Sequence, residues 1–412
     1  MTLFDKFSKL AQDRASLIQD KQKSPFGTRI DQIYSPTEGR VGERRVVLAG
    51  TNNYLGLTFD PDCIAAARHA LEEEGTGTTG SRMANGTYGS HWALEAELAE
   101  FFGRRSAMVF STGYLANLGT IGTLAGPEDI VLLDADCHAS IYDACRMGGS
   151  QGIRFRHNDA ADMEKRLRRL GDRARDTLIV VEGIYSMLGD QAPLADIADV
   201  KRRLGGFLMV DEAHSVGVLG EHGRGLAEAA GVEADVDMIV GTFSKSLGAI
   251  GGFAVSQHPE LDLLRYASRP YIFTASSSPS SIASVRAALK VMQARPELRQ
   301  RLWDNAGRLY SGLAALGYSL GPQLGPVVAV TLGSPQEGVA FWNALIENGV
   351  YVNLVLPPAS PGGQALVRVS VSAAHSFEQI DRIIEAFDRL RPLVAGGEQA
   401  PAQLVEGEAS AG

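Results

Sequence analysis

Residues 238–256 form the sequence MIVGTFSKSLGAIGGFAVS, two short apolar runs on either side of a glycine-rich turn that carries one lysine, Lys245. Short runs of apolar and β-branched residues bounded by glycine are typical of buried strands. A lysine in such a turn either contacts a nucleotide phosphate or forms a covalent bond with a carbonyl group. The two possibilities predict different proteins, so the flanking sequence has to decide between them.

Seven such runs occur between about residues 105 and 256, and helical segments alternate with them. They are SAMVFST, DIVLLDAD, GIRFRHN, TLIVVEGIYS, FLMVDEAHS, MIVGTFS and GGFAVS. Strands this apolar leave no face for water, so the alternation predicts an α/β fold with a large, mostly parallel seven-stranded sheet covered by helices. Ligands of such folds bind at the carboxyl ends of the strands. Those ends carry Ser111 to Gly113, His138, Ser186, Asp211 with His214, and Ser244 with Lys245.

The chain is expected to divide into four parts. Residues 1–55 form an N-terminal arm, within which residues 3–20 have helical spacing of apolar side chains, and residues 56–290 form the large domain. Residues 291–393 form a smaller α+β domain with a helix (RLWDNAGRLYSGLAALG), a strand pair (PVVAVTL and VYVNLVL), a further strand (ALVRVSVS) and a closing helix (FEQIDRIIEAFDRL). The tail, residues 394–412, lacks aromatic residues and is expected to be disordered.

The composition disfavours several classes of protein. The chain has 39 basic and 48 acidic residues, and its net charge of −9 disfavours binding to nucleic acids and anionic membranes. The three cysteines, Cys63, Cys137 and Cys145, form no CxxC pair, which argues against a disulfide framework or a zinc site and fits a reducing cytoplasm. Neither an apolar signal region nor a run of 18 apolar residues occurs, so we expect a soluble protein without a transmembrane segment.

Three other motifs suggest a nucleotide or metal site, but the sequence around each of them does not support that interpretation. GTGTTG at residues 75–80 matches a dinucleotide-binding fingerprint, but a helical run precedes it where a strand is required. VDEAH at residues 210–214 resembles the magnesium-binding strand end of nucleic-acid motors, yet no phosphate-binding GxxxxGK[ST] string occurs upstream. Asp134, Asp136 and His138 could converge on a metal ion, but no further cluster of ligands supports them.

Pyridoxal phosphate chemistry accounts for the residues at the strand ends. This cofactor needs a lysine for its aldehyde, a carboxylate beside its pyridine nitrogen and donors around its phosphate. Lys245 and Asp211 follow neighbouring predicted strands and meet the first two needs, because a carboxylate stabilises the protonated ring. Gly113 and Tyr114 begin a predicted helix, whose free amides and dipole attract a phosphate.

Four more side chains complete the predicted site. Thr242 and Ser244 add hydroxyl donors beside the lysine, His214 could reach the ring hydroxyl, and His138 could lie on the ring face. Taken singly, each residue has an ordinary structural explanation: a strand-end aspartate often caps a turn, and a lone histidine or lysine is often a core or surface residue. Taken together, in this order and at strand ends, the residues favour a covalent lysine.

The sequence resembles the α-oxoamine synthase family of fold-type I pyridoxal phosphate enzymes over roughly residues 45–390. The matching strings are GTNNYLGL (50–57), GTGTTGSRMANGT (75–87), FSTGYLANLG (110–119), LDADCHASIYD (133–143), VEGIYSMLGD (181–190), VDEAHSVGVLG (210–220), GTFSKSLGAIGG (241–252), RPYIFTAS (269–276) and PPASP (357–361). The resemblance implies a fold-type I transferase with the seven-stranded sheet and smaller C-terminal domain described above.

The resemblance also implies a role for each matching residue. Lys245 would bind the cofactor aldehyde and remove the α-proton of the amino acid, and Asp211 would pair with the pyridine nitrogen. His214 would reach the ring hydroxyl, and His138 would stack on the ring and help to orient the substrates. Arg368 would bind the amino-acid carboxylate, because its fork of donors matches a carboxylate. Further cofactor contacts would be Gly113, Tyr114, Thr242, Ser244, Ser186 and, from the partner subunit of a homodimer, Thr274; further substrate contacts would be Asn53 and Ser81.

The implied reaction joins L-serine to a long-chain acyl thioester with loss of the thiol and CO₂, and the acyl carrier, coenzyme A or acyl carrier protein, stays open. The polar string GSRMANGT favours the serine-using branch over relatives that use glycine or alanine. A non-catalytic homologue is a further alternative, but such relatives typically lack the lysine. Two departures bear on substrate binding: Leu356 stands where some relatives have arginine, and SSSPS, residues 276–280, replaces SLPPS.

Overall fold

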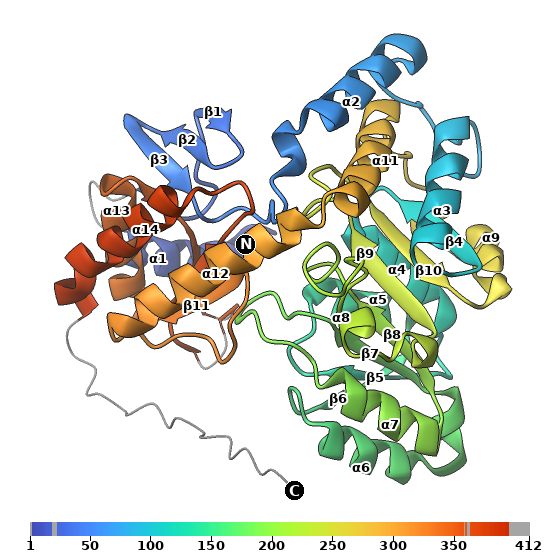
Figure 1. Cartoon of the computed structure of the whole chain (residues 1–412). Helices are drawn as coiled ribbons and strands as arrows, with labels where there is room; N and C mark the ends of the chain where they lie inside the picture. The colour runs from blue at the N-terminus through green and yellow to red at the C-terminus, as the bar shows by residue number, and fades with distance from the viewer. Residues whose placement is uncertain (1, 19–22, 358, 361–362, 395–412) are drawn as a thin grey trace, which may run out of the picture.

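The computed structural model in Figure 1 describes residues 2–18, 23–357, 359–360 and 363–394. Its largest sheet contains all seven predicted strands, in the order β4-β10-β9-β8-β7-β5-β6. Only β10 runs antiparallel to its neighbours, so the expected mostly parallel sheet is confirmed. The strands are β4 (Ser106–Phe110), β5 (Ile130–Asp134), β6 (Gln151–Phe155), β7 (Leu178–Glu182), β8 (Phe207–Asp211), β9 (Met238–Thr242) and β10 (Gly252–Ser256).

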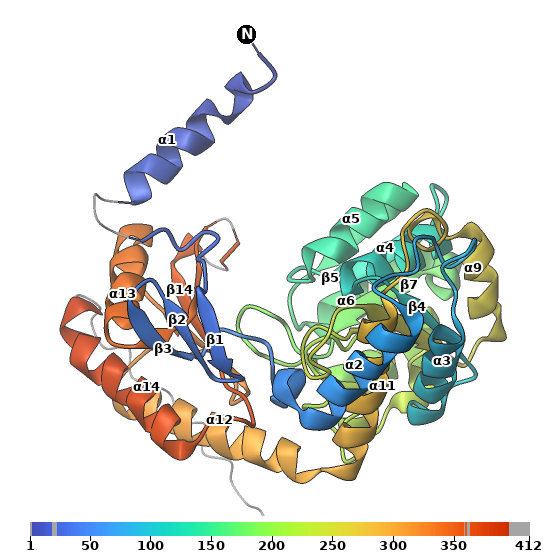
Figure 2. The same ribbon diagram turned by 90° about the horizontal axis from the view of Figure 1, so that it is seen from above.

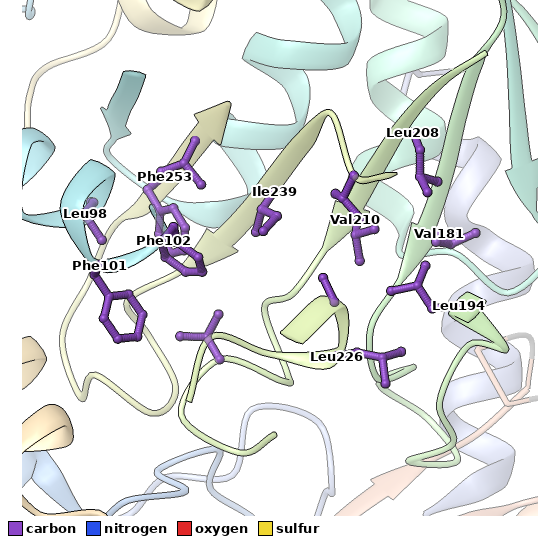
Figure 3. Close-up of a cluster of buried hydrophobic side chains, with 14 of the residues drawn as sticks. Leu98, Phe101, Phe102, Val181, Leu194, Leu208, Val210, Leu226, Ile239 and Phe253 are labelled. Atoms are coloured by element: carbon purple, nitrogen blue, oxygen red, sulfur yellow. The ribbon is translucent and has the colours of Figure 1, made fainter. Parts of the chain in front are cut away.

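Helices cover both faces of this sheet, because successive side chains of each buried strand point to opposite faces. Val181, Val210 and Ile239 belong to one core, which Figure 3 shows packed with side chains of the neighbouring helices and loops. Val180 and Met209, each one residue away, belong to the other core. The first face is covered by α3 (Gly89–Phe101), α6 (Ala160–Leu170), α7 (Leu194–Leu204) and α11 (Pro279–Ala294), and the second by α4 (Gly113–Leu124) and α5 (Ala139–Gly148).

One further helix and three short ones complete this part of the chain. The helix α2 (Pro61–Glu74) packs along α11, and its N-cap residue Asp60 accepts hydrogen bonds from two amides of the first turn. The short helices α8 (Leu226–Ala229), α9 (Leu264–Ala267) and α10 (Arg269–Ile272) lie in loops that follow β8 and β10.

A separate core forms the left part of Figure 1. Its antiparallel sheet has the order β11 (Val327–Thr331), β14 (Leu366–Ser370), β13 (Asn353–Val355), and the packed helices are α12 (Glu297–Ala315), α13 (Pro335–Glu347) and α14 (Phe377–Leu390). The expected strand pair was wrong, because β14 lies between the two segments. The run VYVNLVL is also divided: its first two residues form β12 (Val350–Tyr351), which pairs with a different sheet.

The first 55 residues contain more structure than the predicted arm. The strands β1 (Gln32–Ser35), β2 (Glu38–Val41) and β3 (Arg44–Leu48) form a sheet with β12, and Val46 to Leu48 are buried in the C-terminal core. The helix α1 (Ser8–Leu17) extends away from the body (Figure 2). None of its side chains is fully buried, and its last residue, Leu17, packs against the C-terminal core. Residues 395–412, almost all of the tail expected to be disordered, lie outside the described residues. Within the described ranges, no helix is both long enough and apolar enough to cross a membrane.

Candidate active site

The carboxyl ends of five strands, β4, β5, β7, β8 and β9, meet at one edge of the large sheet. Lys245 follows β9 in a turn closed by a hydrogen bond of 3.0 Å from the Gly248 amide to the Lys245 carbonyl. Burial lowers the pKa of the lysine amine to about 8, although the charges of Asp211 and Glu182 oppose the change. Part of the amine is therefore neutral near physiological pH, and the neutral amine is the form that attacks a carbonyl.

Asp211 ends β8 as a nearly buried carboxylate with two hydrogen bonds. Its Oδ2 accepts from Asn117 Nδ2 at 2.7 Å, and its Oδ1 accepts from the Ala213 amide at 2.9 Å. Asn117 lies one turn beyond Gly113 in α4 and was missed by the sequence analysis, although its place in the string GYLAN was an available signal. These two donors orient the carboxylate that the sequence predicts to face a protonated ring nitrogen.

The ring of His138, at the start of α5, is held neutral. Its Nδ1 accepts a hydrogen bond from the Ser140 amide at 3.2 Å, so the proton belongs on Nε2. Burial lowers the pKa of His138; the charge of Asp211 opposes this change and that of Lys245 adds to it.

A second carboxyl group, that of Glu182, lies beside Asp211 where β7 and β8 end in register. It accepts a hydrogen bond from the His138 amide. Burial and the charge of Asp211 raise the pKa of Glu182 well above its usual value. The sequence analysis missed Glu182, although LIVVE ends in a carboxyl residue just as FLMVD does.

The start of α4 and the turn after β9 form a cradle for an anion. Thr112 caps the helix with its hydroxyl, and the amides of Gly113 and Tyr114 have no carbonyl partner within the helix. A Cβ atom at Gly113 would lie 2.9 Å from Thr242 Cβ, so glycine allows the helix to approach the turn this closely. The hydroxyls of Thr242 and Ser244 lie 2.8 Å apart beside it. Amides, hydroxyls and the helix dipole are the donors that the phosphate of pyridoxal phosphate requires, so the residues present fit this cofactor.

His214 and Arg368 are joined through Tyr54, a fully buried residue that the sequence analysis missed. His214 Nδ1 lies 2.7 Å from Tyr54 Oη, and Arg368 Nη2 donates to the same oxygen at 3.5 Å. Burial and the positive charges of Lys245 and Arg368 lower the pKa of His214 well below its usual value. The imidazole is therefore neutral, and its Nδ1 shares a hydrogen bond with the tyrosine hydroxyl. Because Arg368 belongs to β14, the site includes residues of both cores.

Ser186 and Asn53 lie on the side of the site nearest Arg368 and the C-terminal core. Ser186 contributes its backbone carbonyl, which accepts a hydrogen bond of 2.6 Å from Arg368 Nε. Asn53 is buried and donates to Thr58 Oγ1 at 2.8 Å, while its Oδ1 has no hydrogen-bond partner within the described residues. That orphaned oxygen leaves Asn53 free to accept a hydrogen bond from a ligand.

Ser81 and Thr274 lie in two segments that run together in the same chain. Ser81 pairs with Ala275 as an isolated antiparallel bridge, and the Ser111 hydroxyl donates to the Ala275 carbonyl. Thr274 lines a small cavity next to Ser111. The contribution of Thr274 to the site of a partner subunit stays a prediction.

The two departures from the family pattern have structural roles here. Leu356 is buried in the C-terminal core. Ser278 caps α11, since its hydroxyl accepts from the Ser281 amide, and Pro279 occupies the first helical position. The Ser277 carbonyl is 3.0 Å from His91 Nε2. The polar run therefore begins a helix.

Comparison with known proteins gives one consistent result. The family model for class I and II aminotransferases matches residues 44–387. The chain is 58% identical to a serine palmitoyltransferase of Caulobacter vibrioides over 390 residues, which is 95% of this chain and 96% of that protein. It matches the structure of Sphingomonas wittichii serine palmitoyltransferase with a TM-score of 0.93 and 48% identity, covering 95% of this chain and 99% of that one. A serine palmitoyltransferase from S. paucimobilis with a bound PLP–myriocin aldimine also matches, with a TM-score of 0.93, 46% identity and the same coverage of each chain.

The mostly parallel seven-stranded sheet, with a lysine, an aspartate and an anion cradle at its carboxyl edge, defines the class of fold-type I pyridoxal-phosphate-dependent transferases. Within the class I and II aminotransferases, the chain belongs to the α-oxoamine synthase family.

Proposed function

We propose that this protein is a serine palmitoyltransferase. It condenses L-serine with a palmitoyl thioester and releases 3-ketodihydrosphingosine, CO₂ and the free thiol, the first step of sphingolipid synthesis. The observation that carries this proposal is the 58% identity to a protein of that name over nearly the whole of both chains. The buried Lys245 with Asp211 nearby supports a catalytic protein over a non-catalytic homologue.

The residues around Lys245 suit proton transfer at the α-carbon of an amino acid. Pyridoxal phosphate, when bound, supplies an electron sink for the negative charge that develops at that carbon. Lys245 acts as the base that removes the α-proton and later returns a proton, because its lowered pKa favours the neutral amine. Asp211, oriented by Asn117, would keep the pyridine nitrogen of the bound cofactor protonated, and His214, held by Tyr54, would bind the ring hydroxyl.

Arg368 and His138 orient the amino acid. Arg368 would bind the serine carboxylate through Nη2. Its Nη1 donates to Asn52 Oδ1 and Ser370 Oγ, each at 3.0 Å, and its Nε donates to the Ser186 carbonyl. The neutral His138 would lie on the face of the cofactor ring and offer its Nε2–H to the carboxylate or to the thioester oxygen. Asn53 and Ser81 line the substrate side. Gly113, Tyr114, Thr242 and Ser244 would hold the phosphate, and Ser186 would lie beside the cofactor.

We also propose a cytoplasmic homodimer in which Thr274 of each chain completes the phosphate site of the other. Four large apolar side chains are exposed around the segment that carries this residue: Tyr266 (72%), Phe273 (70%), Leu263 (63%) and Trp92 (54%). An exposed apolar patch of this kind is typical of a protein interface. The three cysteines are free thiols, which fits a reducing compartment.

Product identification tests the proposed reaction. Purified holoenzyme is incubated with palmitoyl-CoA or palmitoyl acyl carrier protein and, separately, L-serine, glycine or L-alanine, and the products are identified by mass spectrometry. We expect 3-ketodihydrosphingosine from L-serine with at least one of the two acyl carriers. Thiol release with glycine or L-alanine but not with L-serine would contradict the proposal.

The mass of the holoenzyme in solution tests the dimer. A mass of about twice the chain mass of 43.9 kDa is expected at micromolar concentration, together with loss of activity in Thr274→Ala. A fully active monomer would refute the shared site.

A further inference from the structure

His157 lies outside the proposed site, just beyond β6, and its ring joins two carboxylates. Nδ1 is 2.8 Å from Asp134 Oδ1, and Nε2 is 2.7 Å from Asp190 Oδ2. Both carboxylates are buried, Asp134 fully and Asp190 nearly so, while the histidine side chain is 24% exposed. Nothing in the proposed reaction uses this cluster, so its place in the fold needs another explanation.

The contacts require the imidazole to be charged. Each ring nitrogen faces a different carboxylate, and a carboxylate only accepts hydrogen bonds. Both nitrogens must therefore carry a proton. Burial opposes that charge, but the hydrogen bonds and charges of Asp134 and Asp190 outweigh it and raise the pKa of His157 to about 10. Asp136 adds a third carboxylate at 3.9 Å from Nδ1, and the edge of the Tyr185 ring packs against the imidazole at 4.5 Å between centroids.

Asp190 lies near the end of a compact loop, residues 183–191. Its carboxylate joins this loop to His157. The Tyr185 amide donates to the Asp190 carbonyl at 2.8 Å, and the Gly189 amide donates to the Tyr185 carbonyl at 3.0 Å. Asn158 Nδ2 donates to Asp190 Oδ2 at 2.8 Å and to the Gln191 carbonyl at 3.1 Å. His157 and Asn158, neighbours in sequence, therefore anchor the same end of the loop.

The C-terminal core holds this loop from the other side. Gly189 adopts φ of +79°, and a Cβ atom there would lie 2.5 Å from the Val327 carbonyl oxygen of β11. The Gln191 amide donates to Gln323 Oε1 at 2.9 Å. Ser186 precedes these anchors, in the turn that the hydrogen bonds of Tyr185 with Gly189 and Asp190 close, and its carbonyl accepts the hydrogen bond from Arg368 Nε.

We propose that His157 is a positioning residue for Arg368. By joining Asp134 of the sheet to Asp190 of the loop, the charged imidazole places the Ser186 carbonyl. That carbonyl holds Nε of the guanidinium group, while Asn52 Oδ1 and Ser370 Oγ hold Nη1. The position of Nε matters because it sets the direction of the Nη2 donors that would face the carboxylate. The inference rests on the proposed function, since it takes Arg368 as the group that binds the serine carboxylate.

The test separates serine binding from the rest of the reaction. In His157→Gln holoenzyme, the glutamine amide has one donor nitrogen in place of two, so the bridge keeps one of its two carboxylate contacts. We expect the KM for L-serine, and the Kd from the absorbance change of the bound cofactor, to rise about tenfold. The kcat at saturating L-serine and the KM for palmitoyl-CoA should stay within about twofold, and the absorbance maximum without serine should not shift.

Two further variants complete the experiment. His258→Gln is the matched control, because His258 is exposed and contacts only one carboxylate, Asp237 at 3.4 Å; its KM for L-serine should be unchanged. Asp190→Asn weakens the same bridge from the loop side and should raise the KM for L-serine in the same way, which also provides a second variant if His157→Gln does not fold.

The outcomes distinguish this inference from the proposed function. If the unsubstituted enzyme responds to L-serine and both bridge variants bind it equally well, the positioning role of His157 is wrong. A parallel loss of cofactor binding, kcat and both KM values would also overturn it, because that pattern indicates a general structural defect. If the unsubstituted enzyme does not respond to L-serine at all, the proposed function fails and this inference fails with it.

Discussion

Two groups of ionisable side chains lie at the same edge of the large sheet, and they hold their histidines in opposite charge states. In the candidate active site, His138 and His214 are neutral, because burial and the positive Lys245 both act against an added proton. In the second group, two carboxylates keep His157 charged although it too is partly buried. Histidines that follow strands of one sheet thus differ in charge, because the charged side chains next to them in the folded protein differ.

The difference assigns different tasks to the two groups. An amine with a pKa of about 8 and two neutral imidazoles can accept or donate protons during a reaction. A charged imidazole between two carboxylates instead joins segments, and removing one partner leaves a buried charge uncompensated. Substitutions in the first group should therefore change activity, while those in the second should change stability and the placement of the loop.

The largest expected effect comes from the lysine. Lys245→Ala should reduce kcat by roughly 10⁴-fold or more, because both the covalent link to the cofactor and the base are lost. Absorbance spectra should lack the visible band of lysine-bound cofactor, and borohydride should no longer attach the cofactor to the protein. A borohydride-reducible adduct at another residue would show that Lys245 has been assigned the wrong role.

A matched pair of aspartate substitutions tests the comparison directly. Asp211→Asn should lower kcat by roughly 10²-fold with little change in stability, because the charge facing the ring nitrogen is lost. Asp134→Asn should lower the free energy of unfolding by about 3 kcal/mol and leave kcat within a few-fold, because it weakens the His157 pair. Steady-state rates and denaturant unfolding measure both quantities. A loss of stability without loss of kcat in Asp211→Asn, together with a large loss of kcat in Asp134→Asn, would contradict these roles.

A pH effect on cofactor binding is expected next. With a pKa of about 8, Lys245 in cofactor-free enzyme is mostly charged at pH 7 and mostly neutral at pH 9. Because only the neutral amine attacks the aldehyde, the rate of cofactor binding should rise about tenfold per pH unit below pH 8 and level off above it. Stopped-flow absorbance measures this rate. A midpoint near the ordinary lysine pKa of about 10.4 would show that burial does not act on this amine.

The smallest expected effect is a pH-dependent difference in stability between the unsubstituted protein and His157→Gln. The pKa of His157 is raised in the folded state, so its contribution is complete below the unfolded value of about 6.5 and is lost as pH rises toward 10. Denaturant unfolding at several pH values should show this difference falling steadily as the pH rises through this range. A difference that grows with pH would mean that His157 is not charged in the folded protein.

Much of the fold and the centre of the site could be predicted from local patterns. Each of the seven strands of the large sheet is a short apolar run followed by a loop, so its position follows from the sequence alone. Strand ends of a mostly parallel sheet share an edge, which brings Lys245, Asp211 and His138 together without knowledge of the packing. Asn117 was missed because it contacts Asp211, which belongs to a different element far away in the sequence. Glu182 was missed for the same reason, since it contacts the His138 amide.

The C-terminal part was less predictable, because strand pairing there is not local. The run VYVNLVL is continuous in sequence, yet Val350 and Tyr351 pair with β3 while Asn353 to Val355 pair with β14. The partner β3 lies about 300 residues earlier in a segment expected to be an arm. The apolar pattern indicates that these residues are extended, but it does not identify which edge they join.

The sequence by itself determined that Asp211 ends one buried strand and that Lys245 follows the next. The reason is that apolar periodicity and the placement of glycines are patterns of neighbouring residues. Only the tertiary structure decided which histidines are charged and how Arg368 is held by the Ser186 carbonyl. The physical reason is that a pKa and the direction of a guanidinium group depend on burial and on charges a few ångströms away. Those neighbours come from segments far apart in the chain, and folding alone brings them together.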